Sequence, residues 1–139
     1  MKPDPKQEAD RWLRQAENDL AVVRMSVREG FYAHACFMSQ QAAEKALKAL
    51  AYLKGDRFVP GHSVKGLLDD LTTTYPELAS VNDGAKQLDQ YYVPTRYPNA
   101  LPGSAPFEVY GREQAEEAVS IAGGIIQLAE RLISREGSN

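Results

Sequence analysis

Apolar residues recur at steps of three and four positions over long stretches of this chain, and nowhere do they alternate with polar residues for the length of a strand. Such spacing places the apolar side chains on one face of an α-helix. Two stripes are the clearest, and they consist of Leu13, Ala16, Leu20, Val23 and Val27, and of Ala118, Ala122, Ile125, Ala129 and Leu132. The pattern therefore predicts an all-α protein without a β-sheet.

Capping residues and helix breakers divide the chain into five expected helices. They cover residues 4–28, 31–54, 63–73, 81–91 and 108–134, with a proline-rich loop over 93–107. Asp4 is expected to cap the first helix and Ser63 the third, because short polar side chains satisfy the free N–H groups of a first turn. Long helices with short or moderate connections fold back on each other. We therefore expect an up-and-down antiparallel bundle of three long helices, with two short helices packed across it.

The second expected helix has an apolar side and a polar face. Its apolar side contains Tyr32, Cys36, Ala43, Ala46, Leu47, Leu50 and Leu53. Gln41, Glu44, Lys45 and Lys48 share another face. This face is interpreted either as a solvated surface or as part of a basic patch that binds phosphates.

The length and composition favour one domain that needs no disulfide or structural metal for stability. A net charge of −3 argues against a general phosphate binder and leaves room for a local basic patch. The single Cys36 excludes an internal disulfide and a cysteine-based zinc site, and it fits a reducing compartment. No apolar run is long enough to span a membrane, and the first residues are too polar for a secretory signal. We expect a single cytoplasmic domain over residues 1–139, without a metal, cofactor or membrane, whose tail over 135–139 is frayed.

Several short motifs follow one another along the expected helices. They are Asp19-Leu20, Gly30-Phe31-Tyr32, Cys36-Phe37, the run from Ser39 to Ala49 (SQQAAEKALKA), His62-Ser63, Leu67-Leu68, Leu88, Tyr91 and Thr95-Arg96-Tyr97-Pro98. The alanine-rich run alone is a weak signal, because such helices are common. In this order and spacing, however, the motifs resemble the HEPN (higher eukaryotes and prokaryotes nucleotide-binding) domain family over residues 9 to 133.

The resemblance implies a symmetric homodimer of helical bundles, often encoded beside a minimal nucleotidyltransferase as a toxin–antitoxin pair. Many members of the family are metal-independent ribonucleases, and their signature is an arginine followed after four to six residues by a histidine at the dimer cleft. Arg96 stands where the family has its arginine, but no histidine follows it. The chain therefore departs from the active pattern, since its two histidines are His34 and His62.

Arg96 is the centre of the expected ligand site. The expected ligand-binding residues are Arg96, Tyr97, Lys45, Lys48, Glu44 and Tyr91. A guanidinium stays protonated and stabilises phosphate charge, and a tyrosine ring can stack on a base. Arg96 and Lys45, flanked by Tyr97, are expected to build a polar anion-binding cleft near the dimer axis. The alternative is that Arg96 forms a salt bridge with Glu44 or Asp19.

Catalysis would need a base, which Arg96 cannot supply near neutral pH. The candidates for catalysis are Arg96 and His62. His62 is either a loop residue that packs and forms a hydrogen bond, or a substitute for the missing histidine that lies near the cleft. Because the usual histidine is absent, the isolated protein is predicted to be a poor ribonuclease.

Three functions remain in this order. The first is a dimeric module that binds nucleotide or RNA and a nucleotidyltransferase partner, as a component of a toxin–antitoxin pair. The second is a metal-independent ribonuclease toxin that acts through Arg96 with a non-standard base. The third is a non-catalytic helical scaffold.

Overall fold

Every regular element in the computed structural model, which describes residues 4–137, is a helix. Three long helices form the bundle: α1 (Pro5–Arg28), α2 (Tyr32–Leu53) and α6 (Arg112–Gly137). Between α2 and α6 the chain forms α3 (Val64–Leu71), the 3₁₀ turn η1 (Pro76–Val81), α4 (Asn82–Asp89), the 3₁₀ turn η2 (Pro98–Ala100) and α5 (Pro106–Val109). The predicted all-α fold, with no strand among the described residues, is confirmed.

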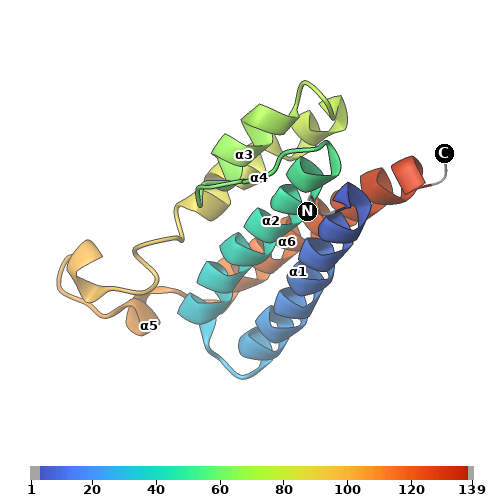
Figure 1. Ribbon diagram of the computed structural model, residues 1–139. Coiled ribbons are helices and arrows are strands. Elements are labelled where there is room, and N and C mark those ends of the chain that lie inside the picture. Colours follow the sequence, from blue (N-terminus) through green and yellow to red (C-terminus); the bar gives the residue numbers. More distant parts are fainter. Residues whose placement is uncertain (1–3, 138–139) are drawn as a thin grey trace.

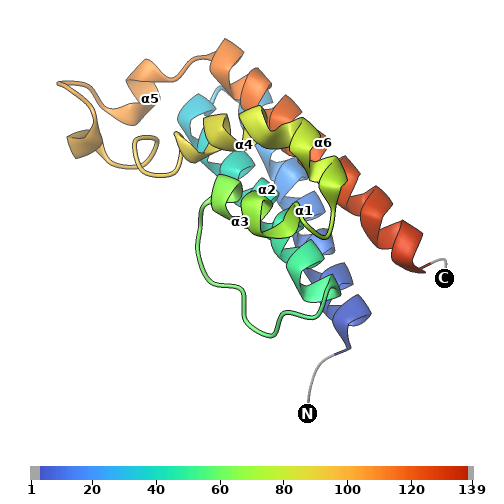
Figure 2. The same cartoon turned by 90° about the horizontal axis from the view of Figure 1, so that it is seen from above.

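Helix α2 lies at the centre of the bundle and contacts α1 and α6 along its length. It follows α1 after a tight turn at Gly30, whose φ of 84° is one that glycine adopts without strain. Helices α2 and α6 run in the same direction, antiparallel to α1, because α3, η1 and α4 carry the chain back across the bundle (Figures 1 and 2). This return brings the residues after α4 beside the first half of α2.

The central position of α2 buries it on nearly all sides. Its alanines are small, so the neighbouring helices approach closely, as the sequence predicts. The polar face predicted for α2 is not a solvated surface. Glu44 and Lys48 are only 4% and 7% exposed and form an ion pair, because other parts of the chain cover that face as well.

The predicted caps of α1 and α3 are confirmed. The Asp4 side chain accepts a hydrogen bond from the backbone N–H of Lys6 at 3.1 Å. The Ser63 hydroxyl accepts one from the backbone N–H of Gly66 at 2.9 Å. Both bonds satisfy N–H groups that a first helical turn leaves without a partner.

The segment between α4 and α6 forms an arm that projects from the bundle (Figure 1). The expected loop over 93–107 contains η2, and α5 begins at its end. The last long helix was expected from residue 108 but begins at Arg112, because the chain is extended at Tyr110 after the four-residue α5. Phe107 on this arm is 75% exposed.

The C-terminal part of α6 is held against η1. The Tyr75 hydroxyl donates a hydrogen bond to Glu136 at 3.0 Å, and Arg135 pairs with Glu77. Helix α6 therefore continues through Gly137, past the start of the tail that was expected to fray, and residues 138–139 lie outside the described residues. Among residues 4–137, no helix has both the length and the apolar character needed to cross a lipid bilayer.

Candidate functional site

Aromatic rings surround the Arg96 guanidinium. Its central carbon lies 4.4 Å from the ring centre of Phe37, 4.7 Å from that of Tyr92 and 5.1 Å from that of Tyr97. Such contacts attract a cation through the electron-rich faces of the rings. Arg96 is nevertheless exposed and has no carboxylate within ion-pair distance among the described residues.

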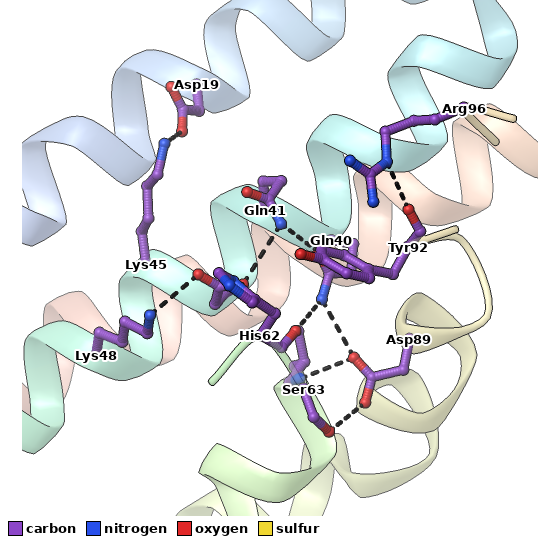
Figure 3. A network of polar contacts seen from close by, with 12 residues as sticks. Asp19, Gln40, Gln41, Lys45, Lys48, His62, Ser63, Asp89, Tyr92 and Arg96 are labelled. Carbon is purple, nitrogen blue, oxygen red and sulfur yellow. Dashed lines mark hydrogen bonds and ion pairs between the residues drawn. The ribbon is translucent and has the colours of Figure 1, made fainter. Parts of the chain in front are cut away.

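The turn after α4 fixes the direction of the Arg96 side chain. Arg96 Nε donates a hydrogen bond to the backbone carbonyl of Tyr92 at 2.8 Å (Figure 3). The backbone N–H of Arg96 bonds to the Val93 carbonyl at 3.0 Å, and the buried Thr95 hydroxyl bonds to the Tyr91 carbonyl. Because Nε is engaged, the two terminal NH₂ groups remain for an external anion.

His62 contacts Tyr92, one of the three rings around Arg96. Its ring stacks on Tyr92 with 5.4 Å between ring centres and 16° between planes. His62 Nδ1 lies 3.2 Å from Glu44 Oε1, so α2 supplies a carboxylate to this loop residue. Tyr92 therefore contacts both His62 and Arg96. The motifs that contain His62 and Arg96 do not indicate that the two residues share this neighbour.

A network from α2 and α4 holds the backbone beside His62. Gln40, which is fully buried in α2, donates from Nε2 to the His62 carbonyl at 2.5 Å. Asp89 at the end of α4 accepts hydrogen bonds from the Ser63 hydroxyl at 2.7 Å and from the backbone N–H of Val64 at 2.8 Å. These bonds fasten the start of α3 to α2 and α4 (Figure 3). The position of His62 is thus fixed by the buried Gln40 and the half-buried Asp89, although the ring itself is exposed.

The two lysines predicted for the ligand site are engaged elsewhere. Lys45 pairs with the buried Asp19 of α1 at 2.5 Å, and Lys48 pairs with Glu44 at 3.3 Å. Phe37, which contacts Arg96, lies eight residues before Lys45 on α2, a rise of about 12 Å. Within one chain Arg96 and Lys45 therefore do not meet, because the lysine turns to α1 and the arginine lies at the other end of the polar network (Figure 3). The cleft expected from these residues near a dimer axis stays a prediction.

The two adjacent tyrosines after α4 have different surroundings. Tyr91, which the sequence predicts as a ligand-binding residue, is 7% exposed and packs against Tyr110 in the core. Burial raises the pKa of its hydroxyl above the usual range. Tyr92 is the tyrosine that contacts both Arg96 and His62. The expected salt bridge of Arg96 to Glu44 or Asp19 is also absent, since both carboxylates pair with lysines.

The comparisons with known proteins agree with this architecture. The family model of the HEPN domain matches residues 9–132. The chain belongs to the HEPN family. The predicted resemblance over residues 9 to 133 is therefore confirmed.

Solved structures resemble this HEPN protein over nearly their whole length. TT1696 from Thermus thermophilus is 43% identical, with a TM-score of 0.83 over 89% of this chain and 97% of the other. ST0689, described as an archaeal HEPN homologue, is 37% identical, with a TM-score of 0.75 over 91% and 98%. An HEPN domain protein from Thermotoga maritima, TM0613, is 36% identical, with a TM-score of 0.73 over 90% and 98%.

One curated relative carries a name that bears on function. A protein of Methanocaldococcus jannaschii, named "Putative toxin MJ1304", is 28% identical over 126 residues, which cover 84% of this chain and 82% of that protein.

Three residues of the HEPN site were not among the predicted ligand-binding residues: Phe37, Gln40 and Tyr92. A helical period does contain a signal for Phe37, since Phe37, Gln41, Glu44 and Lys48 recur at steps of four, three and four along α2. No local pattern indicates Gln40, because its partners His62 and Asp89 are 22 and 49 residues away in the sequence.

Proposed function

We propose that this HEPN protein is a component of a toxin–antitoxin pair and binds RNA or nucleotide through Arg96. The observation that carries the proposal is an exposed guanidinium with free NH₂ groups, held by three aromatic rings and not by a carboxylate. The relative named "Putative toxin MJ1304" supports the same role.

The chemistry of the site favours single-stranded nucleic acid. Two guanidinium NH₂ groups match two oxygens of one phosphate, which gives both charge and geometry. The half-exposed Tyr97 ring offers a face on which an unpaired base can stack. A duplex keeps its bases stacked on each other, so this combination suits a loop or a single strand.

A binding titration with one matched control tests the proposal. Fluorescence anisotropy with labelled single-stranded RNA of mixed sequence is expected to detect binding by the wild type. Arg96→Ala should weaken the affinity about 10- to 100-fold, because a hydrogen-bonded charge pair is lost. Arg131→Ala removes the same charge from an exposed position on α6 and should change the affinity little. Equal affinities for the wild type and Arg96→Ala would contradict the proposal.

We also propose that the protein is a symmetric homodimer. The arm from α4 to α6 carries exposed apolar side chains, of which Tyr97 and Phe107 are 51% and 75% exposed, and paired surfaces commonly cover such groups. Trp12, the single tryptophan of the chain, is stacked on Tyr52 of its own chain with 5.4 Å between ring centres and contributes less to this argument. Light scattering should give twice the chain mass of 15.4 kDa, and a mass of 15.4 kDa at micromolar concentration would contradict dimerisation.

The proposed partner is a small nucleotidyltransferase. A toxin–antitoxin component needs a protein that restrains it, and the resemblance of the sequence motifs points to this class of enzyme. The observation to make is whether the neighbouring reading frame encodes a minimal nucleotidyltransferase. If it does, the two proteins should co-purify when they are expressed together, and expression of this HEPN protein alone should slow growth. Growth that is unaffected in both cases would contradict the toxin role.

A further inference from the structure

A hollow between α1 and α2 lies apart from the Arg96 site, and the function proposed above does not use it. Its volume is about 530 Å³, a size that suits a nucleotide or a segment of a longer strand. The side chains that line it are Glu8, Arg11, Trp12, Arg14, Gln15 and Lys45. Three of these are cations and one is an acid, in a chain whose net charge is −3. The lining is therefore locally positive and favours an anionic ligand.

Arg14 is the cation of this hollow that the protein leaves available. It is exposed, and none of the ion pairs formed among residues 4–137 includes it. Arg11 pairs with Glu8 at 2.9 Å, and Lys45 pairs with the buried Asp19 at 2.5 Å. A phosphate that enters the hollow would therefore find its main partner in the Arg14 guanidinium, which binds two oxygens of one phosphate.

Two neighbouring hollows lack this excess of positive charge. Arg11 and Arg14 also line a second hollow on α1, but Asp10 and Glu17 line it with them, so two acids face two cations there. The hollow before α3, which His62 lines, contains Asp69 and Asp70. Lys45 is thus what sets the hollow between α1 and α2 apart, since it adds a cation from α2 to the two arginines of α1.

A row of side chains along α2 joins this hollow to the Arg96 site. Phe37, Gln41 and Lys45 follow one another at steps of four residues and so share one face of the helix. Phe37 contacts the Arg96 guanidinium, and Lys45 lines the hollow. The half-buried Gln41 lies between Lys45 and Arg96 (Figure 3). Because the rise from Phe37 to Lys45 is about 12 Å, one phosphate cannot reach both places, whereas a strand of several nucleotides can.

We propose that this hollow is a second subsite for single-stranded RNA, in which Arg14 binds one backbone phosphate while Arg96 binds another phosphate of the same strand. This inference rests on the RNA binding proposed above and extends the bound segment along α2. Two weak sites on one strand reinforce each other, because binding at the first raises the effective concentration of RNA at the second. The protein is therefore expected to prefer strands long enough to occupy both sites.

Trp12 reports on the hollow, because it lines the hollow and is the only tryptophan of the chain. Its indole N–H, which donates a hydrogen bond to Glu8 at 3.1 Å, gives one signal in an NMR spectrum of the isotope-labelled protein. Oligouridylate of about 10 nucleotides, within the site sizes of proteins that bind single strands, should shift this signal. Uridine monophosphate should shift it only at concentrations about 100-fold higher, because it cannot bind both sites at once. Equal effects at equal concentrations would contradict the proposal.

Neutralisation of Arg14 tests the phosphate contact itself. Arg14→Gln should weaken the binding of this oligouridylate about 3- to 10-fold, measured by fluorescence anisotropy. The slope of log affinity against log salt concentration should also become shallower by about 0.7, the value for one phosphate contact on a single strand. Arg24→Gln is the matched control, because Arg24 is an exposed arginine on the same helix that lines the hollow toward α6. It should change the affinity and the salt slope little.

The outcomes distinguish this inference from the function on which it rests. RNA that binds the wild type but leaves the Trp12 signal unchanged overturns the second subsite and leaves binding at Arg96 in place. An affinity and a salt slope in Arg14→Gln that equal those of the wild type, or of Arg24→Gln, also overturn the second subsite. RNA that does not bind the wild type at all overturns the proposed function, and the subsite with it.

Discussion

The Arg96 guanidinium contacts one ring from α2 and two from its own turn, and this arrangement explains why it remains exposed and ordered. Aromatic rings orient a cation without neutralising it, whereas a carboxylate would compete with any phosphate. The backbone carbonyl of Tyr92 fixes the remaining freedom of the side chain. A site of this kind holds its charge ready for an anion and needs little rearrangement on binding.

Replacement of Tyr92 by leucine should weaken RNA binding more than it weakens the fold. The ring supports Arg96 and His62 together, so Tyr92→Leu removes one cation–π contact and one stacking contact. The expected loss of binding free energy is about 1–2 kcal/mol. Tyr52→Leu, which removes the ring stacked on Trp12, is the matched control and should bind RNA normally. Anisotropy titrations of both variants measure the difference, and equal losses would contradict the special role of Tyr92.

The buried ion pair of Glu44 and Lys48 should be sensitive to the loss of one partner. Lys48→Met keeps the stem of the side chain near Trp12 but leaves the Glu44 carboxylate buried with fewer partners. We expect a loss of about 3 kcal/mol in the free energy of unfolding, measured with urea. Glu44→Gln/Lys48→Met should recover much of that loss, because neither charge then remains buried alone. A loss below about 1 kcal/mol in Lys48→Met would show that water reaches the pair.

A site residue could be predicted from the sequence where its chemistry depends on its own side chain. It could not be predicted where its role depends on residues far away in the sequence. Arg96 and His62 were predicted because few other side chains can bind phosphate or accept a proton near neutral pH. That Tyr92 and not Tyr91 faces the site depends on how the turn after α4 is oriented. The burial of Lys48 was missed because a helical period assigns residues to faces but does not tell which faces the bundle covers.

At the scale of elements, the crossing of α4 and α6 depends on one glycine. A Cβ at Gly84 would lie 2.7 Å from Cγ2 of Ile121, and the β-branched isoleucine has little freedom to move away. Gly84→Ala should therefore lower the free energy of unfolding by about 1–3 kcal/mol, despite the better helix propensity of alanine. A Cβ at Gly124 on α6 would meet nothing within 4 Å. Gly124→Ala should therefore raise the free energy of unfolding by about 0.5–1 kcal/mol. Thermal unfolding of the two variants should shift in opposite directions.

Helix existence was easier to predict than helix bounds. Capping residues placed the starts of α1 and α3 because their signals are local. The start of α6 was placed four residues early, since Pro106 begins the separate short helix α5 and the extended Tyr110 separates the two. The end of α6 was placed too early because its last turn is held by Tyr75 and Glu77, which lie about 60 residues away in the sequence.

At the scale of the whole molecule, the direction of α6 is a property that periodicity does not predict. A stripe of apolar residues requires a neighbour but does not specify whether the neighbour runs parallel or antiparallel. Here α3, η1 and α4 carry the chain back along the bundle, so that α6 runs parallel to α2 (Figures 1 and 2). The same return path brings His62 and Arg96 to one aromatic group, so the topology of the bundle also builds the site.

The contact of α1 with α6 contains two carboxyl groups, and it should make the stability of the whole bundle depend on pH. Partial burial, a hydrogen bond with Glu130 and the charge of Glu130 raise the pKa of Glu17 above its usual value. A carboxyl group whose pKa is raised by folding binds its proton more tightly in the native state. Its contribution therefore favours the fold at low pH and is lost as the pH rises through the raised pKa. At neutral pH the two charges repel each other across the helix pair.

Glu17→Gln should remove this repulsion and stabilise the protein at pH 7, and the gain should vanish as the pH approaches 4, where the wild-type group is itself protonated. Solvent screens the pair, so the gain is expected to be at most about 0.5 kcal/mol. Glu130→Gln should give the same gain, and the double variant should add little, because either substitution already ends the repulsion. Urea unfolding at pH 7 and pH 4 measures these differences. A gain that is as large at pH 4 as at pH 7 would attribute the effect to helix propensity and not to charge.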